Sequence, residues 1–145
     1  MSIDIDPKIW GKSFWYTLHT ISFTYPYTPN DAAKKKYYDL IQNFPMFLPN
    51  KRMGKEFSKK LNEFPITPYL SSRLSFQKWV HFMHNKLNKQ LGKPEINFHK
   101  GLEQYYLHYE PKKTKRIREM KLQKKYVAIG ISVFLVILGL YYWNK

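Results

Sequence analysis

The chain contains no cysteine. This absence excludes disulfide bonds, thiolate metal sites and a cysteine nucleophile within the chain, and it removes the usual indicator of the redox compartment. Acidic residues are scarce as well, because 10 Asp and Glu stand against 25 Lys and Arg. The opening stretch MSIDIDPKIW has no apolar run after a basic segment, so we expect no secretory signal peptide.

Aromatic side chains are abundant. At 145 residues the chain is long enough for one modest core and too short for two. Phe, Trp and Tyr make up 18% of it, and no segment shows convincing alternation of apolar and polar residues. We therefore expect an all-α protein, a bundle of four to five helices packed by large flat side chains.

Prolines separate the expected helices. Residues 7–24 predict the first helix, which Pro26 follows. Thr28, as a cap before Pro29, predicts a second helix that runs to Phe44. The apolar residues whose helical spacing predicts three further helices are Met53, Phe57 and Leu61; Phe76, Val80, Met83, Leu87 and Leu91; and Leu102, Tyr105 and Tyr109.

An uncharged apolar run lies at residues 127–140. Tyr126 precedes it and the aromatic residues 141–143 follow it, and aromatic rings favour both interfaces of a membrane. As a helix, residues 126–143 would measure ~27 Å, close to the ~30 Å hydrocarbon core of a bilayer. We therefore expect one transmembrane helix. A buried core helix is the alternative, but such a helix is rarely apolar on every face.

A basic juxtamembrane segment, residues 111–125, leads into this span, and its residues 112–125 hold eight Lys or Arg against one Glu. Only Lys145 follows the span as a cation, so the positive-inside bias places the folded domain, residues 1–110, in the cytosol with a two-residue tail across the membrane. The position of the segment favours contact with anionic lipid. Binding of nucleic acid is the alternative, and we expect no nucleic-acid partner.

Two stretches of the expected helices are rich in aromatic, histidine and amide side chains. Residues 10–20 read WGKSFWYTLHT and are followed by Tyr25-Pro26, and residues 79–93 read WVHFMHNKLNKQLGK. In this order and at this separation they resemble the FAD-linked sulfhydryl oxidases of the Erv/ALR type, over about residues 9–106. Because those proteins are small helical-bundle flavoproteins, the resemblance implies their fold and FAD as the cofactor.

The family holds FAD with residues at these positions, and the side chains here suit the task. Trp15 and His19 offer flat surfaces for stacking. His84 and Asn88 lie one turn apart on a helix face, with Asn85 beside them, where they can meet an adenine edge or a ribose. Lysines can meet the pyrophosphate. The cofactor-binding residues that the resemblance implies are Gly11, Lys12, Trp15, His19, Tyr25, His84, Asn85, Asn88, Lys93 and Tyr105.

Other interpretations of these side chains remain open. Trp15 and His19 can instead be core residues, and the histidine and amides of the second stretch can be a solvated face. His81 and His84 also have the i, i+3 spacing of a metal-binding pair on a helix. Because no third ligand lies nearby in the sequence, we expect no metal site.

The chain departs from the family at the redox residues. Relatives carry Pro-Cys-x-x-Cys, whose thiols exchange with substrate and pass electrons to the flavin, whereas here Pro49 is followed by Asn50 and Met53 in the cysteine positions. His81 replaces a further cysteine, and Tyr105 stands where relatives commonly have a stacking Trp. An amide or a thioether can neither attack nor resolve a disulfide. We therefore expect no catalytic residue and no unaided oxidation of dithiols.

The leading hypothesis is a membrane-anchored, catalytically inactive oxidase-like protein that can still bind FAD and acts as a structural or interaction module. The family often forms homodimers, which implies a homodimer or a dimer with an active relative. One alternative is a thiol oxidase or other flavoenzyme that uses a partner's cysteines or another reductant. The other is a basic binder of membrane surfaces. Membrane-anchored versions encoded by large cytoplasmic DNA viruses suggest a virion membrane or a host internal membrane.

Overall fold

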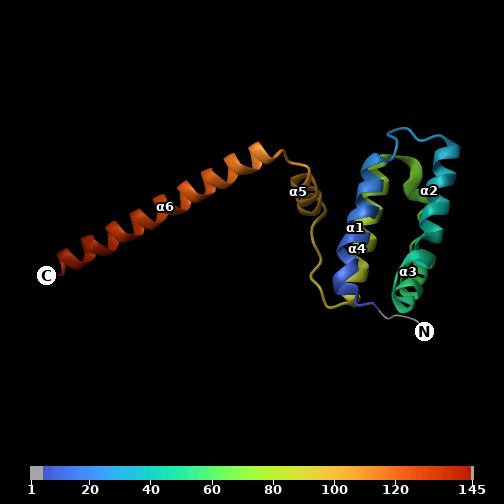
Figure 1. The fold of residues 1–145 in the computed structure, drawn as a ribbon, viewed down its shortest axis with the longest axis horizontal. Helices are drawn as coiled ribbons and strands as arrows, with labels where there is room; N and C mark the ends of the chain where they lie inside the picture. The colour runs from blue at the N-terminus through green and yellow to red at the C-terminus, as the bar shows by residue number, and fades with distance from the viewer. Residues whose placement is uncertain (1–4, 145) are drawn as a thin grey trace. The chain divides into compact units, whose positions relative to one another are not determined.

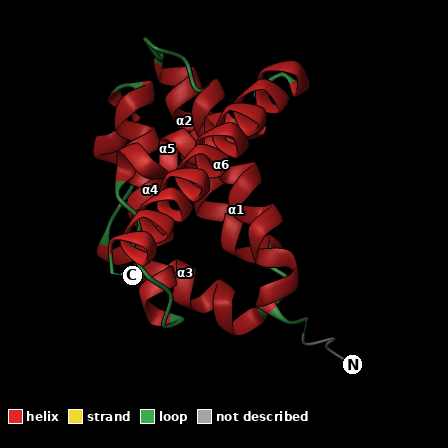
Figure 2. Ribbon diagram, turned by 90° about the vertical axis from the view of Figure 1, so that its left-hand side faces the viewer, coloured by secondary structure: helices red, strands yellow, loops and turns green. Residues whose placement is uncertain are grey.

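The structure, a computed structural model, describes residues 5–144, and all regular structure among them is helical (Figure 2). The chain divides by compactness into two units, Met1–Gly101 and Leu102–Lys145. The helices are α1 (Pro7–Thr24), α2 (Asp31–Asn43), α3 (Lys51–Glu63) and α4 (Arg73–Gln90) in the first unit, α5 (Phe98–His108) across the boundary, and α6 (Lys112–Trp143) in the second. The expected all-α fold is thereby confirmed.

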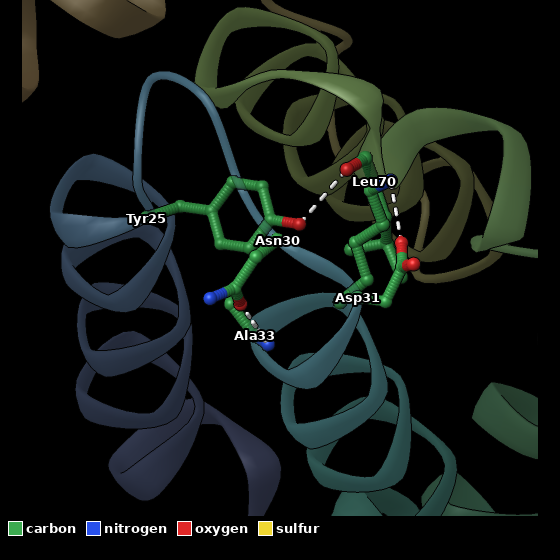
Figure 3. Close-up of polar contacts among 6 residues, drawn as sticks. Tyr25, Asn30, Asp31, Ala33 and Leu70 are labelled. Carbon is green, nitrogen blue, oxygen red and sulfur yellow. Dashed lines mark hydrogen bonds and ion pairs between the residues drawn. The ribbon is translucent and has the colours of Figure 1, made fainter.

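Side-chain caps decide where several helices begin. The carboxamide of Asn30 accepts a hydrogen bond of 2.8 Å from the backbone N–H of Ala33, so α2 begins after Asn30 (Figure 3). The predicted cap at Thr28 is therefore wrong, because Asn30 is the residue whose side chain reaches the free N–H of the first turn. Asn50 caps α3 and Ser72 caps α4 in the same way.

The core of the first unit lies where α1 packs against α4 and where α2, α3 and two short 3-10 turns, Phe44–Phe47 and Thr67–Ser71, pack around them (Figure 1). The predicted apolar stripe of α4 is buried as far as Leu87, but Leu91 is 40% exposed because it lies beyond the end of the helix. The buried apolar residues are Leu18, Tyr25, Ile41, Phe44, Phe57, Leu61, Ile66, Leu70, Phe76, Trp79, Val80, Met83 and Leu87.

A glycine allows α3 to approach the turn that precedes it. A Cβ atom on Gly54 would lie 2.7 Å from the backbone carbonyl oxygen of Pro45. Such a distance is too short for a carbon–oxygen contact, and the oxygen belongs to the backbone, which cannot rotate away as a side chain can. The close packing of α3 on the Phe44–Phe47 turn therefore requires glycine at this position.

The second unit consists mainly of α6, in which the basic segment and the apolar run form one uninterrupted helix of 32 residues. Within the described part of the chain, α6 is the one helix that is long and apolar enough to cross a membrane, and none of that apolar stretch is buried within the protein. The expected apolar C-terminal helix is confirmed in this sense. The domain limits predicted at residues 110 and 125 remain predictions.

Candidate functional site

Two aromatic side chains from the sequence motifs stack between α1 and α4. The indole of Trp15 lies almost parallel to the imidazole of His84, with ring centroids 4.1 Å apart and an interplanar angle of 11°. His19, one turn further along α1, places Nε2 3.1 Å from Nδ1 of His84. The packing of α1 on α4 therefore brings Trp15, His19 and His84 together, as a shared site requires.

The two histidines are held in their neutral form. Burial, with smaller effects of His84 and His81, lowers the pKa of His19 to about 3. Burial, with smaller effects of His81 and Lys93, lowers the pKa of His84 to about 4. At pH 7 both imidazoles are therefore uncharged, and the contact between them is one N–H···N hydrogen bond in which one ring donates and the other accepts.

Asn88 is a largely enclosed residue whose carboxamide forms no hydrogen bond within the described chain. It lies one turn after His84 on α4 and is 9% exposed. Its polar atoms still reach solvent, because among the described residues the fully buried side-chain atom without a hydrogen bond is Oε2 of Glu110, and water can therefore bind the Asn88 carboxamide in the free protein. Asn88 therefore has both a donor and an acceptor available to a bound molecule beside the Trp15–His84 stack.

The end of α4 holds Lys93 near this site. Gly92 adopts a positive φ of 67°, and the N–H of Lys93 then donates a hydrogen bond of 2.9 Å to the backbone carbonyl of Asn88. Glycine favours this backbone conformation because it has no Cβ. Lys93 is among the causes of the lowered pKa of His84, so its ammonium lies close enough to affect that ring.

Gly11 begins a column on α1 that continues one turn later with Trp15 and then with His19. A Cβ atom on Gly11 would meet no heavy atom within 4 Å. Glycine inside a helix costs ~0.5–1 kcal/mol relative to alanine, and the packing of this chain does not require it here. The open space beside Gly11, with exposed Lys12 next to it, suits the close approach of a ligand.

Asn85, by contrast, is used by the protein itself. Its carboxamide nitrogen donates to the carbonyl of Ile96 at 2.8 Å, and its oxygen accepts from the Ile96 N–H at 3.1 Å. His81 Nε2 lies 2.7 Å from the same carbonyl oxygen. These contacts fasten the segment before α5 to α4. The sequence analysis missed this role because Asn85 and Ile96 are 11 residues apart, and the sequence does not show that they lie side by side in the fold.

Tyr25 lies in the core, fully buried, and its hydroxyl donates a hydrogen bond of 2.8 Å to the carbonyl of Leu70 (Figure 3). The structure thus gives Tyr25 a role in packing, and a cofactor contact for it remains a prediction. Tyr105 lies on α5 in the second unit, where its ring centroid is 6.1 Å from that of His108. Its predicted cofactor contact also remains a prediction.

The two positions that hold cysteines in the resembling family have other tasks here. The Asn50 side chain accepts a hydrogen bond of 3.0 Å from the N–H of Met53 and caps α3. Met53 lines an apolar cavity of about 30 Å³ together with Trp10, Phe14, Trp15, Phe44, Leu48, Phe57 and Leu87. The cavity also reaches Trp15, so Met53 lies beside the candidate site.

Comparison with known proteins identifies the family. The model of the Erv1/Alr family matches residues 12–106, which include the second sequence motif and all of the first except Trp10 and Gly11. The chain belongs to the Erv1/Alr family. The expected resemblance is thus confirmed, and the chain is a member without cysteine. Among residues 5–144 there is also no group of three or more His, Cys, Asp or Glu side chains that could hold a metal ion.

Several proteins named as sulfhydryl oxidases are similar to this chain in sequence. A probable FAD-linked sulfhydryl oxidase of Acanthamoeba polyphaga mimivirus is 29% identical over 110 residues, which is 75% of this chain and 77% of that protein. A putative FAD-linked sulfhydryl oxidase of Invertebrate iridescent virus 6 is 34% identical over 63% of this chain and 86% of its own length. The mitochondrial FAD-linked sulfhydryl oxidase ERV1 of Saccharomyces cerevisiae is 32% identical, over 60% of this chain and 45% of that protein.

Solved structures show the same fold. The FAD-binding domain of Erv1 from Saccharomyces cerevisiae matches with a TM-score of 0.61 and 30% identity over 66% of this chain and 89% of that chain. The yeast Erv1 core matches with the same TM-score and identity over 68% of this chain and 83% of that chain. FAD is thus the cofactor named for the relatives, as the resemblance implied.

Proposed function

We propose that this protein is a membrane-tethered FAD-binding member of the Erv1/Alr family that has lost thiol oxidation. The observation that supports FAD binding most directly is Asn88, a largely enclosed residue beside the Trp15–His84 stack whose carboxamide forms no hydrogen bond within the described chain. The open space at Gly11 supports it independently. The glycine costs stability in the protein alone, and the Asn88 carboxamide exchanges water for a ligand when the site is occupied.

Each of these residues would contribute a distinct interaction. Trp15 and His84 offer ring surfaces against which a planar group can stack. Asn88 would donate to and accept from a ring edge or a ribose hydroxyl. Lys12 and Lys93 would offset the charge of a pyrophosphate. When bound, FAD supplies two-electron redox chemistry, and the protein supplies binding and orientation.

The loss of thiol oxidation follows from the chemistry of the redox positions. Exchange with a dithiol substrate needs a thiolate that attacks and a second sulfur that resolves the mixed disulfide. The chain contains no cysteine, and the two positions hold a capping amide, Asn50, and an apolar thioether, Met53. The protein therefore cannot receive electrons from a dithiol through its own residues, and it acts as a binding or interaction module.

FAD retention is tested on the full chain purified in a nonionic detergent. We expect visible flavin absorbance to copurify with the protein and to fall in Asn88→Ala, because this change removes the unpartnered carboxamide. Asn62→Ala, an exposed asparagine on α3, is the matched control and should retain the flavin. A folded wild-type protein that stays colourless after FAD is added would refute the proposal.

We also propose that α6 anchors the protein in a membrane, with the first unit on the cytosolic side. Its length, its exposed apolar residues and the basic residues before them support this assignment. The viral relatives support a virion membrane or a host internal membrane as the location.

We expect wild-type protein to resist alkaline carbonate extraction and the variant Ile131→Arg/Leu135→Arg to be extracted, since each Arg buried in the bilayer costs ~2.5–3.5 kcal/mol. If both proteins resist extraction equally, α6 is not the membrane anchor.

A further inference from the structure

A second surface of the first unit is hollowed and lies outside the candidate cofactor site. It has a volume of about 590 Å³ and is formed by the end of α2, the Phe44–Phe47 turn and one side of α3. The residues that line it are Gln42, Pro45, Met46, Leu48, Lys51, Gly54, Lys55, Ser58, Lys59 and Asn62. We call this surface the lysine hollow. Apart from Leu48, none of these residues lines the cavity at Met53.

Three lysines form one row along the lysine hollow. Lys51, Lys55 and Lys59 follow one another at single-turn intervals on α3, so their side chains share a helix face. All three are exposed, and none forms an ion pair within 4 Å in the described chain, although Lys59 is near enough to Glu63 to help lower the pKa of that carboxyl. Like charges in one row repel one another, which is a cost that an anionic partner would remove.

The start of α3 adds to this positive potential. The first turn of α3 carries no acidic residue, and its cap, Asn50, is neutral. The partial positive charge of the helix N-terminus is therefore not offset by a carboxylate of the same turn. No residue that lines the lysine hollow is acidic. The whole surface consequently favours negative charge.

The lysine hollow also presents an apolar side. Met46 is 75% exposed, and Leu48 and Pro45 lie beside it. Methionine side chains adapt to partners of varied shape because they are unbranched and polarisable. The phosphate backbone of a nucleic acid would meet the lysine charges but would leave Met46 without an apolar contact. A lipid surface can bury an exposed Met, but it is flat and does not fill a hollow of about 590 Å³. A polypeptide can supply both carboxylates and an apolar side chain.

We propose that the lysine hollow binds an acidic segment of a partner protein, with carboxylates opposite Lys51, Lys55 and Lys59 and an apolar side chain against Met46. The lysines recur about every 6 Å along α3, given ~1.5 Å of rise per residue. Carboxylates at every fourth position of a helix, or at alternate positions of a strand, have about this spacing. The interaction is independent of FAD, because the surface shares no polar residue with the cofactor site.

The test uses the full chain in a nonionic detergent and a fluorescent synthetic peptide with Glu at every fourth position and a Leu between the charges. Fluorescence anisotropy measures binding at low salt and again at ~0.5 M salt, where exposed charges are screened. We expect Lys51→Gln/Lys55→Gln/Lys59→Gln to weaken binding about tenfold or more. The matched control, Lys8→Gln/Lys36→Gln/Lys78→Gln, removes the same charge from exposed lysines elsewhere and should bind within about twofold of wild type.

Two further measurements separate the proposal from general attraction of polyanions. Met46→Ser should weaken binding of the Glu/Leu peptide severalfold. The same substitution should not change binding of a peptide that has Ser in place of Leu. Single-stranded DNA of equal charge should compete poorly. The proposal is overturned if wild type does not bind the peptide, if both triple variants lose binding equally, or if the DNA competes as well as the peptide. Flavin absorbance of the same preparations shows separately whether the cofactor site is intact.

Discussion

The carboxamide of Asn85 holds both backbone groups of Ile96, donating to its carbonyl at 2.8 Å and accepting from its N–H at 3.1 Å. Asn88, one turn away on the same helix, forms no side-chain hydrogen bond with the described chain. Two asparagines of one motif thus differ in what they contact. Asn85 stabilises the protein, and Asn88 is available to a ligand.

This difference predicts opposite effects of two substitutions. Asn85→Ala should lower the free energy of unfolding by ~1–3 kcal/mol, because it leaves the Ile96 groups without partners. Asn88→Ala should leave the stability of the flavin-free protein unchanged or slightly raised and should weaken flavin binding. Chemical denaturation followed by tryptophan fluorescence measures the first quantity, and flavin absorbance the second. If Asn88→Ala destabilises the flavin-free protein as strongly as Asn85→Ala, the assignment of Asn88 to a ligand is wrong.

Two glycines provide a second contrast. A Cβ on Gly101 would lie 2.6 Å from Cε1 of His81, a ring that its contact with Ile96 holds in place. Gly101→Ala should therefore cost ~1–3 kcal/mol of stability through overpacking. A Cβ on Gly11 would meet no heavy atom within 4 Å, so Gly11→Ala should stabilise the flavin-free protein by ~0.5–1 kcal/mol. Because the added methyl group occupies the open space beside the site, the same substitution should reduce flavin binding. Thermal denaturation of both variants measures their stabilities. Equal changes of the melting temperature in the same direction would contradict the contrast between a crowded Gly101 and an open Gly11.

His19, which is buried, and His84, which is partly buried, predict a pH dependence of stability. In the folded state the pKa of His19 is lowered to about 3 and that of His84 to about 4, whereas both rings titrate near 6.5 when unfolded. Between these values the unfolded chain binds more protons, so stability is highest above pH 6.5 and falls as the pH falls toward 4. The slope approaches ~1.4 kcal/mol per pH unit for each ring.

Denaturation series at pH 7, 6 and 5 measure this slope. His84→Gln should reduce it by about half, because one of the two neutral rings is removed. His99→Gln replaces an exposed histidine and should leave the slope unchanged. A stability that is flat between pH 7 and pH 5 would show that these rings are not held neutral.

Cysteines introduced at positions 50 and 53 should give the protein thiol oxidase activity. The wild-type protein with FAD should consume oxygen in the presence of dithiothreitol no faster than free FAD does, since it has no thiol. Asn50→Cys/Met53→Cys places one thiol at the cap and one in the first turn of α3, where the helix N-terminus lowers the pKa of a cysteine. The rate should then rise by about tenfold or more.

The control for this gain is Asn50→Ser/Met53→Ala, in which serine keeps the cap of α3 without a thiol. It should behave as wild type. Fast oxygen consumption by the wild-type protein, above that of free FAD, would show that the loss of the cysteine pair did not abolish oxidase activity. It would favour a flavoenzyme with another route for electrons.

Local physics fixed much of the fold in advance. Apolar residues at helical spacing, with prolines between the segments, predicted α1, α3 and α4 because both signals act within a few residues of chain. The uncharged apolar run at residues 127–140 likewise predicted the apolar part of α6. The cap of α2 was misassigned because Thr28 and Asn30 are both good capping residues, and the backbone conformation decides between them.

The amino-acid sequence alone determined that the protein is helical, that it contains no cysteine and that residues 127–140 form an apolar stretch of helix. The tertiary structure decided which motif residues are available to a ligand. Tyr25 bonds to Leu70 and Asn85 to Ile96, whereas Asn88 bonds to neither backbone nor side chain through its carboxamide. Hydrogen bonds between segments distant in sequence depend on how the helices pack, and residue type and spacing do not specify that packing.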